Sequence, residues 1–196
     1  MDATGMKSES RPLYGLAPTK KYVRVLAFKA EPYEPRVDIL GCISYDKPLV
    51  CETKTTIERK KAGVKGYTKI QKKEFIRKKV APEVKKIPVG IIFVIDKGLR
   101  FKPEEVKEEL VKGGANNIED VWIIPTGAGK LVNPLDNAMW HEMKDRVRSR
   151  NANSEKHTAK FMKEEFMKTS KDDIHNYFRH CALTFRSDLY NGLEDN

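Results

Sequence analysis

The stretch VGIIFVID (89–96) decides the fold. It is a continuous apolar run that ends in an acid, and such runs are typical of a strand buried on both faces of a sheet. KPEEVKEELVKGG (102–114) begins with a proline and two glutamates and ends in glycines, which predicts a short helix. DVWIIP (120–125) is then a second buried strand. The order strand, helix, strand predicts a parallel crossover.

Upstream of this unit, three segments are rich in β-branched and aromatic residues. They are YVRVLAF (22–28), RVDILGCISY (36–45) and PLVCETKTT (48–56). The short Asp46-Lys47 connection predicts a hairpin between the last two. Turn residues dominate the first 21 residues, so we expect no regular structure there.

Helical patterns alternate with these strands. Residues 68–87 place apolar side chains on one face, and Pro82 is expected to break or kink this helix. LVNPLDNAMWHEMKDRV (131–147) predicts another helix, which Asn133 caps and Pro134 opens. The tryptophans Trp122 and Trp140 fit packing in the core or at its edge.

Two more helices are predicted at 157–168 and 172–190. An antiparallel hairpin followed by β–α–β crossovers gives an α/β fold, a mixed sheet flanked by helices. Of the folds with this order, the ribonuclease H-like one fits best. We expect residues 1–150 to form this domain and residues 151–196 to form a C-terminal helical tail.

Charge is concentrated in one part of the chain. The net charge is +10, and the segment from Lys54 to Lys86 holds thirteen Lys or Arg and three Glu, which equals that surplus. Such a block favours a nucleic acid as partner, while a solvated lysine-rich surface is the alternative. ERKKAGVKGY (58–67) reads as a basic loop. The expected nucleic-acid-binding residues are Lys60, Lys61, Lys65, Lys69, Lys72 and Lys73.

Several classes of protein do not fit the sequence. The longest apolar run, GIIFVI (90–95), is far shorter than a membrane span, and MDATGMKSES (1–10) lacks the apolar core of a signal peptide. Cys42, Cys51 and Cys181 have no metal-binding or redox spacing. We therefore expect a protein that is neither secreted nor membrane-bound, in the nucleus of a eukaryote or otherwise in the cytoplasm.

Two aspartates are placed to share a site. Asp96 ends the most apolar strand, and Asp136 opens the helix after the next strand, so both can face one edge of the sheet. Taken singly, Asp96 is predicted to be a turn residue, and Asp136 is predicted to stabilise its helix by interacting with the helix dipole. Together they would repel unless a cation lies between them, and Mg²⁺ prefers such carboxylates. Asp2 is the candidate for a third ligand.

Four segments carry a resemblance to a known family. DATG…YGLAPTKKYVRV (2–25), RVDILGCISYDKPLV (36–50), IIFVIDKGLRFK (91–102) and NPLDNAMWHEMK (133–144) resemble, in this order, the DDE/D transposases of the mariner and related insertion-sequence superfamily. The interval of 39 residues between Asp96 and Asp136 is similar to that of mariner-like members with a final aspartate.

The resemblance implies a fold, a reaction and a site. It implies a ribonuclease H-like catalytic domain in which Asp2, Asp96 and Asp136 are the catalytic residues and the metal ligands. The implied cofactor is Mg²⁺ or Mn²⁺, two ions in an intact site. The implied reaction is cleavage and strand transfer of DNA, in which water and then a 3′-hydroxyl attack a phosphodiester.

The chain departs from the family pattern at several positions. Lys97 replaces the asparagine that follows the second acid, and Phe101 replaces a nearby histidine. In the family the first acid ends a central strand, whereas Asp2 is the second residue here, so that strand is expected to be missing. The segment 22–28, with Glu31 as a substitute acid, would be the replacement.

These departures leave alternatives to an enzyme open. One is a non-enzymatic, basic nucleic-acid-binding remnant of a transposase. Another is an interaction module built on the helical tail, in which Phe178 and Phe185 form the face of a homodimer rather than packing on the domain.

Overall fold

The computed structural model describes residues 1–7, 35–150, 152 and 154–190, with side chains up to residue 181. Within these residues, five strands form two sheets. The antiparallel sheet contains β1 (Asp2–Lys7), β2 (Arg36–Ile43) and β3 (Pro48–Lys54), and the parallel pair contains β4 (Ile91–Asp96) and β5 (Ile118–Ile124). The predicted mixed α/β class is confirmed at this level.

The two sheets meet edge to edge at Met1. The Met1 nitrogen donates a hydrogen bond to the Val94 carbonyl at 2.7 Å, and the Asp96 nitrogen donates to the Met1 carbonyl at 3.3 Å. Met1 thus forms hydrogen bonds with Val94 and Asp96, the two neighbours of Ile95, which is the hydrogen-bond pattern of parallel strands. At Met1 the β1 edge of the antiparallel sheet therefore meets the β4 edge of the parallel pair, and the start of β1 lies beside the end of β4.

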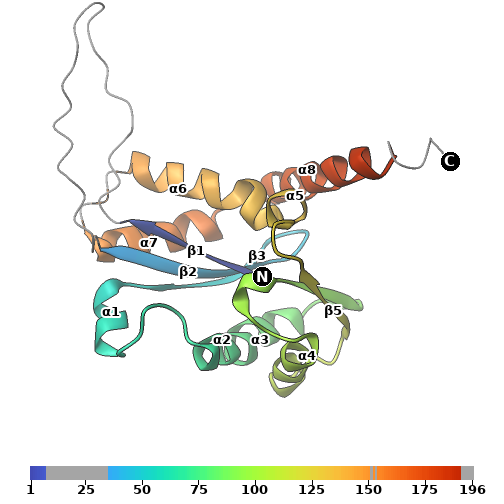
Figure 1. The fold of residues 1–196 in the computed structure, drawn as a ribbon, viewed down its shortest axis with the longest axis horizontal. Coiled ribbons are helices and arrows are strands. Elements are labelled where there is room, and N and C mark those ends of the chain that lie inside the picture. The colour runs from blue at the N-terminus through green and yellow to red at the C-terminus, as the bar shows by residue number, and fades with distance from the viewer. Residues whose placement is uncertain (8–34, 151, 153, 191–196) are drawn as a thin grey trace, which may run out of the picture.

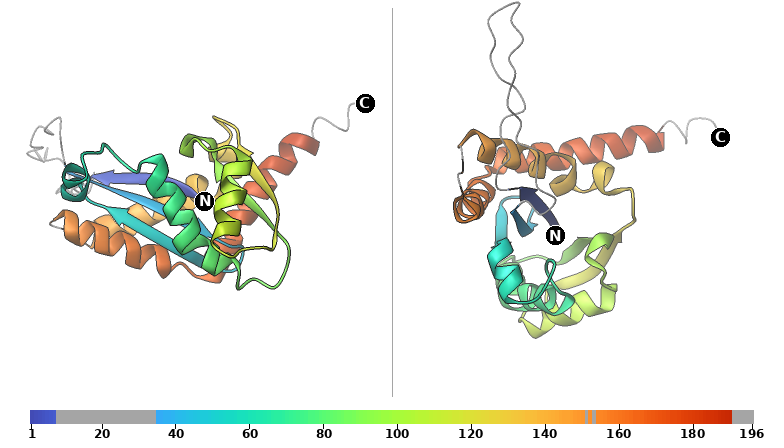
Figure 2. Two further views of the ribbon diagram at one scale, coloured as in Figure 1. Left: turned by 90° about the horizontal axis from the view of Figure 1, so that it is seen from below. Right: turned by 60° about the vertical axis from the view of Figure 1, so that its left-hand side comes forward.

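Helices lie on both sides of the antiparallel sheet (Figure 1). One group lies on the face below the sheet in Figure 1, and it comprises α1 (Thr56–Lys61), α2 (Lys69–Phe75), a π turn (Ile76–Val80), α3 (Ala81–Val84) and α4 (Pro103–Lys112). The other group comprises α5 (Gly129–Val132), a π turn (Leu135–Met139), α6 (Trp140–Ser149), α7 (Glu155–Met167) and α8 (Lys171–Tyr190). The end of α8 extends away from the rest of the described structure in both views of Figure 2.

The core has two parts, one on each side of β2. Leu40 and Cys42 face the cluster formed with α2–α4, whereas Val37 and Ile39 face the cluster formed with α6 and α7. In α6 and the turn before it, the predicted stripe is buried as expected. It consists of Leu135, Met139, Met143 and Val147. Helix α7, which follows the predicted boundary at residue 150, packs on β2 and β3.

Several expectations about the N-terminal half are corrected. The expectation of no regular structure in the first 21 residues is wrong for residues 2–7, because they form β1, which pairs with β2. The basic loop expected at 58–67 begins in helix α1, since Thr55 and Glu58 form a reciprocal capping box at its start. The predicted strand at 22–28 and Glu31 lie outside the described residues.

The helix predicted over 68–87 is confirmed, and Pro82 does not end it. The π turn Ile76–Val80 lies just before the proline, and the Ala81 nitrogen bonds to the Ile76 carbonyl, five residues back. This wider turn shifts the hydrogen-bond pattern where the proline lacks its N–H.

The expectation that β4 and β5 are buried on both faces is wrong. Helix α4 packs on one side, where Phe93 and Ile95 are buried. Within the described residues the other side is open: Ile92 is 44%, Val94 38% and Trp122 55% exposed. A continuous apolar run indicates that a strand can be buried, but it does not indicate whether one face of the strand or both faces are covered. No helix of the described structure is long and apolar enough to cross a membrane.

Candidate active site

Asp2 is buried at the start of β1 and is held by three hydrogen bonds. Its Oδ2 accepts from the side-chain nitrogens of Asn133 and Trp140, each at 3.0 Å. Its Oδ1 accepts from the Ala3 nitrogen at 2.6 Å. The residue is 6% exposed. Among the described residues, the donors to this carboxylate are therefore neutral groups.

The sequence around Asn133 explains how its side chain reaches Asp2. Asn133 Oδ1 accepts from the Leu135 nitrogen at 3.1 Å, which caps the following turn. The amide nitrogen then points away from the helix toward β1. The predicted cap is confirmed, and the same side chain has a second role at Asp2.

Trp140 reaches Asp2 because β2 carries a glycine opposite it. Gly41 pairs with Asp2 across the two strands. A methyl group at Gly41 would lie 2.6 Å from the Trp140 ring and 2.7 Å from Phe166. The rings of Trp140 and Phe166 stack at 5.5 Å over this gap. Because Gly41 has no side chain, there is room for the Trp140 indole at this position.

The environment of Asp2 disfavours its charge. Burial raises the pKa of its carboxyl group, and the nearby Asp96 carboxylate raises it further, whereas the hydrogen bonds from Ala3 and Trp140 and the positive charge of the Met1 amino group lower it. The net direction is upward from the ordinary value of 3.8. A cation close to Asp2 would therefore stabilise its ionised form.

Asp96 and Asp136 converge on Gly129. Asp96 ends β4, and its Oδ1 accepts from the Gly98 nitrogen at 2.6 Å. A methyl group at Gly129 would lie 3.5 Å from Asp96 Oδ2 and 3.0 Å from Asp136 Oδ2. Asp136 is exposed in the turn before α6. The two carboxylates thus approach one point beside a residue that has no side chain.

The three predicted acids are neighbours, but they do not all face one point. The described residues contain no group of three or more His, Cys, Asp or Glu side chains arranged to hold one ion. Asp96 and Asp136 form a pair, and Asp2 lies close enough for the Asp96 charge to affect its pKa. Carboxylate oxygens are the ligands that Mg²⁺ prefers, often one or two with substrate oxygens completing the shell. The pair therefore suits a divalent ion.

Lys144 is a further group that sequence reasoning missed. It is partly buried on α6, and its Nζ donates to Thr4 Oγ1 at 2.7 Å. Burial lowers its pKa, and the charge of Arg148 lowers it too, whereas Asp136 and Asp2 raise it. Its position one turn after Trp140 places both on one face of the helix, which is the signal that could have found it.

The two residues that depart from the family pattern follow Asp96 in the sequence. Lys97 is exposed directly after Asp96. Phe101 is buried, and the Lys69 ammonium lies 5.8 Å from its ring centre. Phe101 therefore packs in the core, where a histidine would have presented ring nitrogens.

The predicted nucleic-acid-binding lysines fall into two sets. Lys69 and Lys73 pair with Glu105 at 2.8 and 3.1 Å, and Lys72 donates to the Leu99 carbonyl at 3.3 Å. Burial lowers the pKa of Lys72. The other set, on α1 and the turn after it, is exposed to solvent and consists of Lys60, Lys61 and Lys65.

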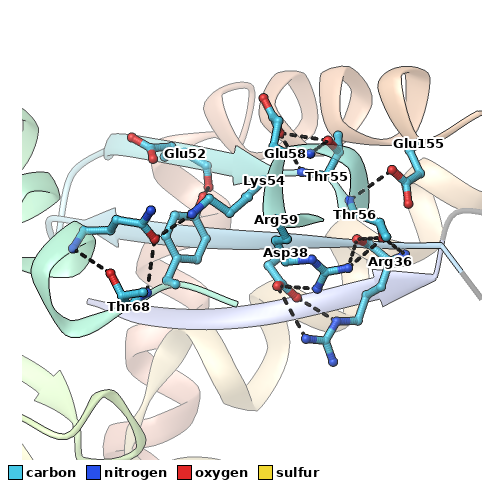
Figure 3. A network of polar contacts seen from close by, with 12 residues as sticks. Arg36, Asp38, Glu52, Lys54, Thr55, Thr56, Glu58, Arg59, Thr68 and Glu155 are labelled. Atoms are coloured by element: carbon cyan, nitrogen blue, oxygen red, sulfur yellow. Dashed lines mark hydrogen bonds and ion pairs between the residues drawn. The ribbon is translucent and has the colours of Figure 1, made fainter. Parts of the chain in front are cut away.

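Helix α1 is fixed to the sheet by a buried ion pair (Figure 3). Arg59 Nη1 lies 2.7 Å from Asp38 Oδ2, and Arg59 Nη2 donates to the Arg36 carbonyl at 2.9 Å and to Thr56 Oγ1 at 2.7 Å. Arg36 Nε also pairs with Asp38, at 2.7 Å. These contacts fix the helix that carries the exposed lysines.

No family model matches the chain, and no curated protein matches it.

Proposed function

We propose that this chain has the ribonuclease H-like fold and is a DDE/D transposase-type catalytic domain, which cleaves and joins DNA strands with Mg²⁺ or Mn²⁺. The observation that carries the proposal is the approach of Asp96 and Asp136 to Gly129 beside the buried Asp2. The meeting of the β1 edge of one sheet with the β4 edge of the other at Met1 supports it, and so do the four sequence segments that resemble the family.

The side chains at this site can take different roles in the reaction. Asp96 Oδ2 and Asp136 Oδ2 would hold one ion, and Asp2 would supply a ligand to the second. Bound ions in such sites activate the attacking oxygen and stabilise the leaving one. Lys144, partly buried near Asp2 and Asp136, would attract a phosphate to this edge of the sheet.

A non-enzymatic, basic nucleic-acid-binding remnant is the second candidate. The observation that favours it is the exposure of Lys60, Lys61 and Lys65 on a helix anchored by Arg59. Contacts to phosphates weaken steeply as salt rises. This candidate predicts salt-sensitive DNA binding that needs these lysines, with no effect of a divalent metal and no cleavage.

A nicking assay on supercoiled plasmid with Mn²⁺ tests the first candidate. We expect the parent chain to nick DNA and Asp136→Asn to lose at least about 100-fold in rate, because one ligand of the ion is gone. Asp145→Asn is the matched control, since Asp145 is an exposed aspartate on α6 that pairs with Arg148. Equal rates in both variants, or no nicking by the parent chain, would contradict the proposal.

A further inference from the structure

Asp2 is tied to the segment that carries Asp136. Asn133 and Trp140 lie on either side of Asp136 in the sequence, and both donate to the same oxygen of Asp2. Asn133 also caps the turn that contains Asp136. Two hydrogen bonds and a cap therefore fix the start of β1 relative to this turn.

The geometry points to Asn133 and Trp140 as positioning residues that hold Asp2 by Oδ2 and leave Oδ1 for a divalent metal ion. This inference rests on the proposed function, because it assigns roles around the same metal site. Oδ1 accepts from the Ala3 nitrogen alone among the described residues, so it has capacity for an ion. Neither Asn133 nor Trp140 is expected to touch the ion or the DNA.

We call Asn133 and Trp140 the clamp on Asp2. Both residues are buried, which indicates that the geometry of the clamp is fixed. Asn133 is 4% and Trp140 is 3% exposed, and the indole is confined between Phe166 and the bare backbone of Gly41. A carboxylate with one oxygen fully engaged presents the other in one direction. Partners of this kind set the orientation of metal ligands, and their loss typically costs roughly 10–100-fold in metal affinity.

The chain contains a matched control for the indole. Trp122 Nε1 donates to Asp120 Oδ2 at 2.7 Å, so both tryptophans bond an aspartate through the same nitrogen. Trp122 is 55% exposed on β5. Trp140→Phe and Trp122→Phe thus remove the same chemical contact, and only the first contact lies at the proposed site.

The test is Mn²⁺ affinity measured by calorimetry on the parent chain and on Trp140→Phe, Asn133→Ser and Trp122→Phe. We expect affinity to fall roughly 10–100-fold in the first two variants and to stay unchanged in the third. Phe keeps the stacking on Phe166, and Ser keeps an oxygen that can cap the turn, so both should fold. Circular dichroism spectra that overlay the parent chain's would verify this for each variant.

A second measurement follows Trp140 itself. In a Trp122→Phe background, Trp140 is the remaining tryptophan, and Mn²⁺ bound at Asp2 should quench its fluorescence. Asp2→Asn in the same background should abolish the quenching.

The outcomes separate the two claims. Parental Mn²⁺ binding that Asp136→Ala abolishes, with unchanged affinity in Trp140→Phe and Asn133→Ser, would overturn the clamp and leave the proposed function standing. Quenching that persists in Asp2→Asn would also overturn the clamp. No Mn²⁺ binding by the parent chain would overturn both.

Discussion

The two buried aspartates of the sheet, Asp2 and Asp38, lie on adjacent strands and have opposite surroundings. Asp38 is 8% exposed and is paired with two guanidinium groups, those of Arg59 and Arg36. Asp2 is 6% exposed, and within the described structure it is bonded by an amide, an indole and a backbone nitrogen.

This difference shows how a structural aspartate can be told from a functional one. The charge of Asp38 is compensated by cations that belong to the chain, and the result is an anchored helix. Asp2 receives directional hydrogen bonds that orient it, while burial raises its pKa. Among the described residues no charged side chain donates to Asp2, and the positive charge of the Met1 amino group only partly offsets the effect of burial, so this carboxylate is suited to bind a further cation.

The largest effect on stability is expected from breaking the ion pair between Asp38 and Arg59. Arg59→Met should lower the free energy of unfolding by roughly 3 kcal/mol, because it leaves a buried carboxylate with one partly exposed partner, Arg36. Urea denaturation measures the loss. Arg148→Met, which breaks a pair with the exposed Asp145, should change the midpoint little. Equal losses in the two variants would mean that the pair at Asp38 does not anchor α1.

A smaller effect is expected at the glycine that makes room for the clamp on Asp2. Gly41→Ala places a methyl group 2.6 Å from Trp140 and should cost about 1–3 kcal/mol of stability, since the ring must shift. The near-ultraviolet spectrum of Trp140 should change as well. Gly66→Ala is the control, because its methyl group would meet Asp38 Oδ2 at an ordinary 3.7 Å. An unchanged midpoint in Gly41→Ala would show that Trp140 is not confined there.

The smallest effect concerns pH. The pKa of Asp2 is higher in the folded chain than in the unfolded one, so its ionisation opposes folding as pH rises above about 3.8. Asp2→Asn lacks this titration. The stability of the parent chain relative to Asp2→Asn should therefore fall between pH 4 and pH 7, by about 1.4 kcal/mol for each unit of raised pKa. Urea midpoints in the presence of a chelator measure this, and a pH-independent difference would contradict it.

Local patterns predicted most of the described elements, and contacts between distant segments explain what they missed. The hairpin of β2 and β3 followed from alternation and a short turn, and the burial of the α6 stripe followed from its spacing. The T-x-x-E cap at Thr55 was a local signal that the prediction overlooked. We expected both tryptophans to pack in the core or at its edge. Trp122 is 55% exposed and Trp140 is 3% exposed, because burial depends on which helix covers which face of the sheet.

The candidate site could be predicted in part. The pairing of Asp96 and Asp136 followed from strand ends that share one edge of a sheet. The contact of Asn133 with Asp2 spans 131 positions in the sequence, so a helix cap was all that its local pattern could indicate.

Calorimetric titration of Mn²⁺ at low salt tests the central claim most directly. The account predicts that the parent chain and Asp145→Asn bind the ion, that Asp136→Ala does not, and that Asp2→Asn binds it more weakly. Absence of binding in the parent chain, or binding that survives in Asp136→Ala, would contradict the account and leave Asp2 as a buried structural carboxylate.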